Sequence, residues 1–339
     1  MGFFSFKYEL AMDLGTANTV IIHDGKVVVD QPSYVTINKK TDKVEAVGDM
    51  AYSNFEKENN DLRSIRPLRD GVVADLEACQ VMIRELIRKA IPGRGFLPRS
   101  LKIVICIPSG STDVEVRAVK EAAEKAGANE VYLIHEPMAA AIGIGLNVLD
   151  PMGNMVVDIG GGTTEIAVIS LGGIVSNKSI KVAGDELTND IVNFMKTEHN
   201  MRIGERTAEQ IKKSVGAAIV NLENPPEEFE VCGQDQVGIL PKIIKVSHKD
   251  IAECWEKSIL KIETAIENAL DNTAPELYAD IVRNGVYLAG GGALIKGLDK
   301  RFSNKFKIPF HVAEDPLHMV SMGTYEALKN TSKYRLLIK

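Results

Sequence analysis

The sequence predicts an α/β protein built from two related halves, and three observations carry this prediction. Apolar strands alternate with helical segments through much of the chain, as in a sheet covered on its faces. A strand ending in aspartate, a glycine turn with threonine and a second strand occur twice, around residues 8–23 and 155–170. The length of 339 residues is sufficient for two domains. We therefore expect two similar domains that face each other.

The first half begins with short strands and then alternates strands with helices. Asp24-Gly25 is a strong hairpin signal between two of these strands, and Pro92-Gly93 ends the first long helix. The expected elements are strands at 8–13, 19–23 and 27–29, weak strands at 35–37 and 44–47, a helix at 75–91, a strand at 101–107, a helix at 113–126, a strand at 131–134 and an alanine-rich helix from Pro137.

The second half repeats the opening pattern and then becomes richer in helices. The segment at 221–245 contains Pro225, Pro226, Gly233 and Gly238, which favours a small β-rich appendage. The other expected elements are strands at 155–159 and 165–170, helices at 185–199, 207–218 and 249–272, and a strand at 285–288 that leads into a helix.

Composition excludes several classes of function. Hydrophobic residues make up 45% of the chain and charged residues 25%, as in an ordinary folded protein. The net charge of -6 argues against broad nucleic-acid binding, which needs basic surface. The four cysteines form no CxxC pair, and no apolar stretch reaches the length of about 20 residues that spans a membrane. The apolar segment at residues 1–7 is too short for a secretory signal, so we expect a cytoplasmic protein.

Two loops have the composition of phosphate-binding turns. They are Asp13–Asn18 (DLGTAN) and Asp158–Thr164 (DIGGGTT), and each follows an apolar strand. Glycines let backbone N–H groups approach phosphate oxygens closely, and an aspartate can hold Mg²⁺ through water. The first loop alone could be an ordinary hairpin. Two such loops in matching contexts favour a metal–phosphate site between the halves, with Asp13 and Asp158 pointing into it.

A third glycine loop, Gly290-Gly291-Gly292-Ala293, lies between a strand and an expected helix. A backbone without side chains would let a purine and its ribose lie against it, near a helix N-terminus. The same pattern is also a common device for close packing of a strand and a helix. The chain has no GxxxxGK[ST] segment and no GxGxxG in a βαβ unit, which excludes a P-loop and disfavours a Rossmann site.

These motifs resemble the signature segments of the superfamily that includes actin, sugar kinases and DnaK-type chaperones. In wording and order they are most similar to the MreB family of bacterial rod-shape actins, and the resemblance runs from about Tyr8 to Leu328. The segments that carry it are Asp13–Thr19 (DLGTANT), His135–Gly143 (HEPMAAAIG), Asp158–Ser170 (DIGGGTTEIAVIS), Leu288–Ala293 (LAGGGA), Arg66–Asp75 (RPLRDGVVAD) and Ala313–Leu317 (AEDPL).

The resemblance implies an actin-like fold, in which two duplicated domains of the ribonuclease H-like type surround a central nucleotide cleft. Such a fold has four subdomains. By position they are subdomain IA at 1–31, 75–145 and 315–339, subdomain IB at 32–74, subdomain IIA at 146–181 and 243–314, and subdomain IIB at 182–242.

The resemblance also implies ATP and Mg²⁺ as cofactors, with Asp13 and Asp158 holding the metal through water. On the residues alone, Glu209 and Lys212 are an i,i+3 ion pair on a helix, and nucleotide contact there comes only from the resemblance. The implied nucleotide residues are Gly15, Thr16, Ala17 and Asn18 in the first loop, Gly160, Gly161, Gly162 and Thr163 in the second, Glu209, Gln210, Ile211 and Lys212 on a helix, and Gly290, Gly291, Gly292 and Ala293 in the third loop.

Glu136 is the candidate catalytic residue, with Thr163 helping to position water or phosphate. Glu136 follows a strand and precedes Pro137, so it should lie at the start of a helix facing the cleft. A carboxylate there could accept a hydrogen bond from water and align it with the γ-phosphate. The alternative is a glutamate favoured only by the helix dipole. His135 is expected to be packed or paired rather than catalytic.

Membrane contact is expected at the loop of residues 93–99, where Phe96 and Leu97 lie between arginines. An exposed apolar pair beside cations suits shallow insertion into an anionic leaflet, although these side chains could also fold onto the core. Phe3, Phe4 and Phe6 could form a second anchor. Weak insertions gain strength when a polymer aligns many of them.

By resemblance, the protein polymerises into paired protofilaments on the inner face of the cell membrane and directs cell shape and lateral cell-wall synthesis. It would hydrolyse ATP slowly, as a weak ATPase rather than a metabolic enzyme. Expected partners are copies of itself and cell-wall elongation proteins of the MreC, MreD and RodZ type, with no nucleic acid. The alternative is a small-molecule kinase of the sugar or acetate type, which would share the phosphate loops and add a substrate pocket.

Overall fold

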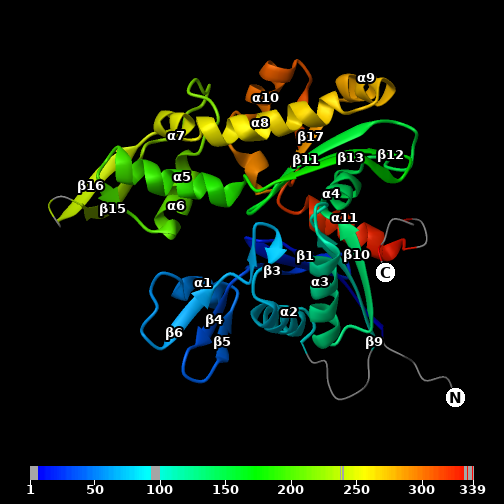
Figure 1. The fold of residues 1–339 in the computed structure, drawn as a ribbon, viewed down its shortest axis with the longest axis horizontal. Helices are drawn as coiled ribbons and strands as arrows, with labels where there is room; N and C mark the ends of the chain where they lie inside the picture. Colours follow the sequence, from blue (N-terminus) through cyan, green and yellow to red (C-terminus); the bar gives the residue numbers. More distant parts are fainter. Residues whose placement is uncertain are drawn as a thin grey trace.

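The computed structural model describes residues 7–92, 100–236, 238, 240–331, 334 and 338. Two five-stranded sheets form its two halves, and a smaller three-stranded sheet accompanies each of them. Figure 1 shows the first half in blue and cyan and the second half in green to orange. The predicted α/β architecture with two similar halves is therefore present.

The sheet of the first half has the strand order β10-β9-β1-β2-β3, with β1 antiparallel to β2 and parallel to β9. Asp24 and Gly25 both have positive φ angles, of 48° and 75°, as the predicted hairpin turn requires. The strands are β1 (Lys7–Leu14), β2 (Asn18–His23), β3 (Lys26–Pro32), β9 (Ser100–Ile107) and β10 (Glu130–His135).

Helices cover both faces of this sheet. Alternate residues of β1 and β9 point to opposite sides, so one set packs on α2 and α3 and the other on α4 and α11. Asp75 caps α2 by accepting a hydrogen bond from the Ala78 N–H at 3.0 Å, and Thr112 and Glu115 form a capping box at α3. The helices are α2 (Leu76–Ala90), α3 (Asp113–Lys125), α4 (Glu136–Ile144) and α11 (Met319–Lys329).

The sheet of the second half has the order β13-β12-β11-β17-β18 and repeats the antiparallel pair followed by parallel strands. One face packs on α5, α6, α8 and α10, and the other packs on α4, so that α4 and α11 belong to a core shared by both halves. The strands are β11 (Asn154–Ile159), β12 (Thr164–Ser170), β13 (Gly173–Ile180), β17 (Val286–Ala289) and β18 (Phe310–Val312), and the helices are α5 (Gly184–Thr197), α6 (Glu205–Val215), α8 (Glu256–Asp271) and α10 (Leu298–Phe306).

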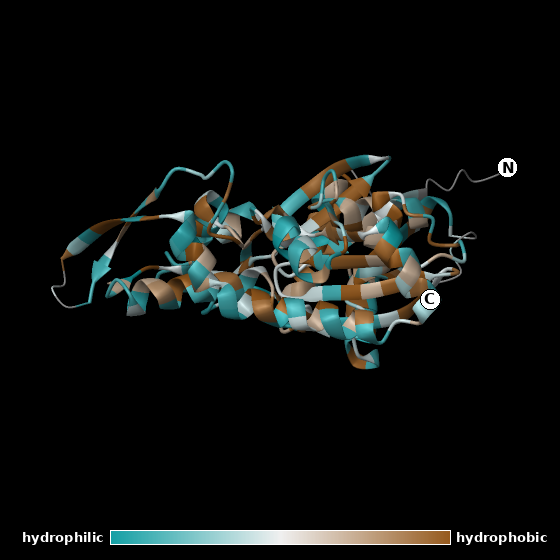
Figure 2. Cartoon of the chain, turned by 90° about the horizontal axis from the view of Figure 1, so that it is seen from above, coloured by the Kyte–Doolittle hydropathy of each residue, from teal (hydrophilic) through white to brown (hydrophobic). Residues whose placement is uncertain are grey.

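Two small sheets lie at the ends of the halves, and a two-stranded pair, β7 and β8, precedes α2. The ribbon of β15 and β16 extends from one end of the molecule (Figure 2). The subdomain boundaries given above stay a prediction. The elements are β4 (Val35–Asn38), β5 (Lys43–Val47), α1 (Asp49–Asn54), β6 (Leu62–Ile65), β7 (Leu68–Arg69) and β8 (Val72–Val73) in the first half, and β14 (Met201–Arg202), β15 (Phe229–Asp235) and β16 (Pro241–Val246) in the second.

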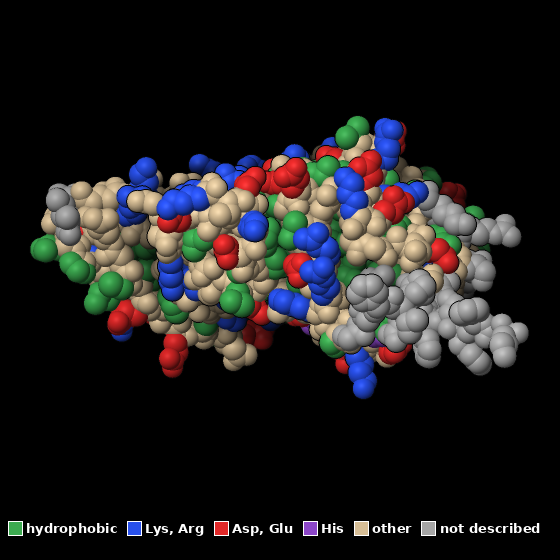
Figure 3. All heavy atoms as spheres, turned by 90° about the horizontal axis from the view of Figure 1, so that it is seen from below, with side chains coloured by type: hydrophobic (Ala, Val, Ile, Leu, Met, Phe, Trp, Pro, Cys, Tyr) green, Lys and Arg blue, Asp and Glu red, His purple; other side chains and the backbone are tan. Residues whose placement is uncertain are grey.

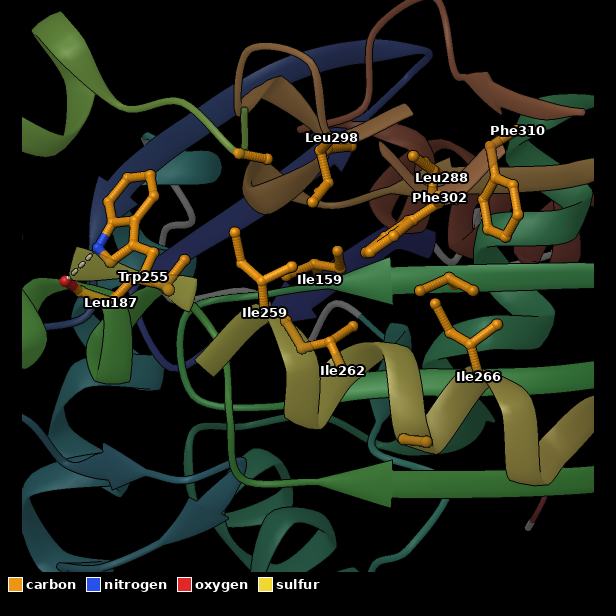
Figure 4. Close-up of a cluster of buried hydrophobic side chains, with 14 of the residues drawn as sticks. Ile159, Leu187, Trp255, Ile259, Ile262, Ile266, Leu288, Leu298, Phe302 and Phe310 are labelled. Carbon is orange, nitrogen blue, oxygen red and sulfur yellow. Dashed lines mark hydrogen bonds between the residues drawn. The ribbon is translucent and has the colours of Figure 1, made fainter. Parts of the chain in front are cut away.

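The structure differs from the sequence prediction mainly in the helices of the second half. The helix expected at 249–272 is divided at Trp255 into α7 (His248–Cys254) and α8. Trp255 is fully buried, and its indole N–H donates to the Leu187 carbonyl at 2.9 Å (Figure 4). This tertiary contact sets the break, so the helical pattern on either side could not reveal it.

The segment after β17 also differs from the expected single helix. A 3₁₀ turn, η1 (Gly291–Leu294), follows the strand, with Ala293 buried, and α10 begins only after Gly297. Helix α9 (Pro275–Asn284) was not predicted, nor were α11, β13 and β18.

Candidate functional site

The two glycine loops of the internal repeat lie against each other. A Cβ atom added to Gly161 would lie 2.7 Å from the Cβ of Ala17, and one added to Gly162 would lie 2.9 Å from the Thr16 Oγ1. Real Cβ contacts are longer than this, so the approach of the two loops requires glycine at both positions. The structure thus brings the loop after β1 and the loop after β11 together across the two halves.

Hydrogen bonds fix the first loop. The Ser33 hydroxyl donates to the Gly15 carbonyl at 2.7 Å, and the Gly71 N–H donates to the Thr16 hydroxyl at 3.1 Å. A Cβ on Gly15 would lie only 2.5 Å from the carbonyl oxygen of Asn18, whose own side chain is exposed. The tight turn between β1 and β2 therefore needs glycine for steric reasons.

The second loop is held from the start of α5. The Gly160 N–H donates to the Thr163 carbonyl at 2.9 Å, which closes the turn. The Gly184 N–H donates to the Gly160 carbonyl at 3.1 Å, and the Asp185 N–H donates to the Gly161 carbonyl at 2.7 Å. With its carbonyls held in this way, the loop keeps a fixed conformation.

Carboxyl groups from both halves meet beside these loops and perturb one another. Burial raises the pKa of Asp13 to about 6, although a contact of 3.0 Å with the Cys106 thiol opposes this shift. Burial, and then the negative charges of Asp13 and Glu165, raise the pKa of Asp158 to about 7. Burial followed by the same carboxylates and Asp158 raises the pKa of Glu136 well above its usual range. A cation among these groups would favour their ionised forms.

A hydrated divalent cation fits this donor set. Mg²⁺ prefers oxygen ligands and keeps several of its waters, and Asp13 and Asp158 approach it from opposite halves. Over the described part of the chain, no three His, Cys, Asp or Glu side chains are spaced to coordinate one ion directly.

The third glycine loop packs on the end of β11, at Asp158 and Ile159. Gly290 has a φ of 76°, and a Cβ there would collide with the Asp158 carboxylate and the Ile159 carbonyl. A Cβ on Gly292 would collide with the side chain of Ile159. Close packing thus requires glycine at these two positions. This was the alternative interpretation of the loop, as a device for packing a strand closely against a helix. Gly291, in contrast, is exposed.

Helix α6 directs two of its four predicted residues toward the second loop. The Lys212 ammonium lies 2.6 Å from the Glu209 carboxylate and donates to the Gly184 carbonyl at 2.9 Å. Burial tends to raise the pKa of Glu209, but the charge and hydrogen bond of Lys212, with smaller contributions from Thr188 and Lys213, outweigh burial and lower it. Gln210 is exposed, and Ile211 is fully buried in the core, which leaves only its backbone for a ligand contact.

Comparison with known proteins identifies the family of this chain. Residues 7–336 match the family model described as MreB/Mbl protein. The chain is 44% identical to the cell shape-determining protein Mbl of Bacillus subtilis over 97% of this chain and 98% of the relative. It is 41% identical to the cell shape-determining protein MreB of Escherichia coli K12 over 96% of this chain and 94% of the relative.

The chain belongs to the MreB/Mbl family. Its structure is similar to MreB5 of Spiroplasma citri bound to AMPPNP, with a TM-score of 0.90 and 38% identity over 96% of this chain and 97% of the other. The ADP-bound form of MreB5 gives a TM-score of 0.91. The fold is also that of MamK, solved as a double helical filament, at a TM-score of 0.79 and 21% identity. The predicted actin-like fold and family are confirmed.

The residues that were predicted from the sequence to contact a membrane lie outside the described part of the chain. They are Phe96 and Leu97 in one loop and Phe3, Phe4 and Phe6 at the start. Among the described residues, none of the helices combines the length and apolarity that crossing a membrane requires. On the face shown in Figure 3, lysines and arginines are interspersed with acidic residues.

Glu165 belongs to this site, although it was not predicted from the sequence. It is fully buried on β12 and accepts hydrogen bonds from the Ser109 backbone N–H at 3.1 Å, the Ser109 hydroxyl and the Ser179 hydroxyl at 2.6 Å. Ser109 lies in the first half and Ser179 in the second, so the carboxylate joins the two. A glutamate inside the apolar run TEIAVIS was the available signal.

His135 lines a cavity of about 330 Å³ beside the start of α4. Its Nδ1 is buried and has no hydrogen-bond partner among the described residues, and burial lowers the pKa of the imidazole. The role of His135 in catalysis stays a prediction. A second cavity of about 710 Å³, lined by Val220, Glu256 and Arg301 among others, includes no residue of the glycine loops.

Proposed function

We propose that this protein binds ATP with Mg²⁺ between its two halves and is a cytoskeletal protein that determines cell shape. The observation that carries the proposal is the contact between the two glycine loops, one led by the partly buried Asp13 and the other by the buried Asp158. Relatives support it, because MreB5 of Spiroplasma citri is bound to AMPPNP or ADP. Mbl of Bacillus subtilis and MreB of Escherichia coli are described as cell shape-determining proteins.

The residues of the chain have distinct roles in this proposal. Bound Mg-ATP supplies the phosphoanhydride bond that is hydrolysed. Backbone N–H groups of the glycine loops would contact the phosphates, and Asp13 and Asp158 would hold the metal through its waters. Lys212 and Glu209 lie beside Gly184, the first residue of α5, where they could contact ribose and base.

Glu136 is the residue that we propose aligns the attacking water. It begins α4 next to the carboxylates of both halves, and burial, followed by the charges of Asp158, Glu165 and Asp13, raises its pKa well above the usual range. A cation held by Asp13 and Asp158 would favour the ionised form of Glu136, which could accept a hydrogen bond from water. Thr163, buried in the second loop, helps to hold the phosphate side of this arrangement.

Self-assembly into filaments is the second part of the proposal. A protein that determines cell shape must act over distances far larger than one chain of 339 residues, and a repeated head-to-tail contact achieves this. Exposed apolar side chains at one end of the molecule are available for such a contact, among them Leu240 and Ile243 around the β15–β16 ribbon. We propose paired protofilaments, as expected from the family.

The filaments would lie on the inner face of the cell membrane and direct lateral cell-wall synthesis. Phe96 and Leu97, with Phe3, Phe4 and Phe6, are the proposed anchors, and alignment in a polymer multiplies their weak individual affinities. Cell-wall elongation proteins of the MreC, MreD and RodZ type are the proposed partners.

Co-sedimentation with anionic liposomes, with and without Mg-ATP, together with a phosphate-release assay, tests this function. We expect Mg-ATP to increase the pelleted fraction, and replacement of Phe96 and Leu97 by serine to remove liposome binding while nucleotide binding persists. Asp158→Ala should abolish nucleotide binding, whereas exposed Asp42→Asn should not. A protein that stays monomeric in every condition and rapidly phosphorylates a sugar would instead be a small-molecule kinase.

A further inference from the structure

The small lobe of β4–β6 and α1 makes a second contact with the other half, away from the glycine loops. Glu56 follows α1 with a φ of 62°, and its carboxylate accepts hydrogen bonds from the N–H groups of Glu205 at 2.7 Å and Arg206 at 3.2 Å. These are the first residues of α6. Gly204 precedes them, and a Cβ there would lie 2.6 Å from a Glu56 carboxylate oxygen. A residue of one half thus caps a helix of the other.

A side chain at the start of α6 also contacts the small lobe. The Arg206 guanidinium donates to the Ser53 carbonyl at 3.2 Å and lies 5.1 Å from the centre of the Tyr52 ring. Both partners belong to the α1 segment that leads to Glu56. The lobe and the start of α6 are therefore joined by reciprocal bonds between residues about 150 positions apart in sequence.

Arg66 joins the same lobe to the phosphate loops. Its guanidinium donates to the Asp185 carboxylate at 2.7 Å and to the Thr16 carbonyl at 3.4 Å, and it lies 3.5 Å from the Glu205 carboxylate. Thr16 is in the first loop, and Asp185 holds the second loop through the Gly161 carbonyl. The side chain is only 13% exposed, so water weakens these charged contacts little.

We propose that Arg66 and Glu56 are positioning residues, that Arg66 fastens α5 and α6 to the first loop while Glu56 fastens α6 to the small lobe, and that bound nucleotide leaves only after these bonds to the other half have opened. This inference rests on the proposed function, because it assigns the control of nucleotide release at that site. Glu209 and Lys212, the residues proposed to contact ribose and base, are within about two turns of the capped end of α6. Movement of the α6 N-terminus therefore moves those contacts.

The release rate of a fluorescent ATP analogue, measured by stopped flow after addition of excess ATP, tests the proposal. Glu56→Gln keeps the size of the side chain and removes its charge, and Arg66→Lys keeps the charge and removes the planar fork. We expect release to be about fivefold faster in Glu56→Gln and about tenfold faster in Arg66→Lys. The matched control is Lys40→Gln, which breaks the 2.7 Å ion pair of Lys40 with Asp61 inside the same lobe.

Hydrogen exchange on the nucleotide-free protein separates this inference from the proposed function. The amides of Glu205 and Arg206 should exchange faster in Glu56→Gln than in wild type, because glutamine offers one uncharged acceptor oxygen in place of the two carboxylate oxygens that these amides use. Wild-type protein that binds no nucleotide would overturn the proposed function. Release rates that match wild type in both variants, or unchanged exchange of these two amides, would overturn the positioning role alone.

Discussion

Replacing Asp158 by asparagine should stabilise the protein in the absence of metal and nucleotide. Asparagine has the shape of the protonated carboxyl group and cannot ionise. The pKa of Asp158 is raised from 3.8 to about 7 by burial and by the charges of Asp13 and Glu165. The folded state therefore binds this proton more tightly than the unfolded state does, and the wild type loses stability as the pH rises from 3.8 toward 7.

The size of the effect follows from the two pKa values. At about pH 5 the carboxyl group is ionised in the unfolded state but not in the folded state. The interval of about 1.2 pH units between the unfolded-state pKa and this pH corresponds to a loss of about 1.5 kcal/mol in the free energy of unfolding. Above pH 7 the full shift of about 3 units applies, which corresponds to about 4 kcal/mol. Unfolding entropy of about 0.7 kcal/mol/K for a chain of this size converts that value into roughly 5 °C in Tm.

The single tryptophan gives a direct assay. Trp255 is fully buried, so its fluorescence reports unfolding of the second half in which Asp158 lies. Thermal unfolding would be followed with EDTA present at several pH values between about 5 and 8, for wild type, Asp158→Asn and the control Asp42→Asn. Asp42 is exposed on a turn with a φ of 56°, where asparagine is well tolerated.

The reasoning would be refuted if Asp158→Asn were no more stable than wild type near pH 8, or if its advantage did not grow with pH. The control variant should follow wild type throughout. Addition of Mg-ATP should reverse the order, because it stabilises the wild type by binding and the variant has lost a carboxylate that holds the metal.

Three further predictions concern the same site. Glu136→Gln should leave nucleotide affinity within about threefold of wild type and slow phosphate release by about a hundredfold, measured in one turnover; equal rates would remove Glu136 from the reaction. Gly162→Ala should weaken nucleotide binding by about tenfold in an equilibrium titration, because the added Cβ would lie 2.9 Å from the Thr16 Oγ1. Gly160→Ala should weaken binding less, because its added Cβ would have its nearest contact at 3.3 Å. Mg²⁺ affinity, measured by calorimetry with nucleotide present, should be at least about tenfold weaker at about pH 6 than at about pH 8. The reason is that the pKa of Asp158 is raised to about 7, so the carboxyl group is protonated below that pH. An affinity that does not change with pH would argue against Asp158 as a residue that holds the metal.

Local signals predicted much of the fold. The Asp24-Gly25 turn followed from residues that adopt positive φ readily, and α2 followed from apolar positions at helical spacing. Helix α11 escaped prediction because it is buried around most of its surface and its pattern includes Ser321, Gly323 and Thr324, which interrupt the apolar stripe. Gly323 is there because α11 crosses α4 closely enough for any Cβ to collide with the Ala139 carbonyl.

The sequence by itself determined which loops are candidates for phosphate binding, because glycine, aspartate and threonine at a strand end set the local backbone and the available donors. Only the tertiary structure decided how these loops meet and which charges surround them. Asp13 and Asp158 have raised pKa values because the packing of the two halves shields both from solvent and brings further carboxylates near them, and Arg66 reaches Asp185 across 119 positions of the chain. Such contacts depend on how whole sheets and helices pack, and no short stretch of residues encodes that arrangement.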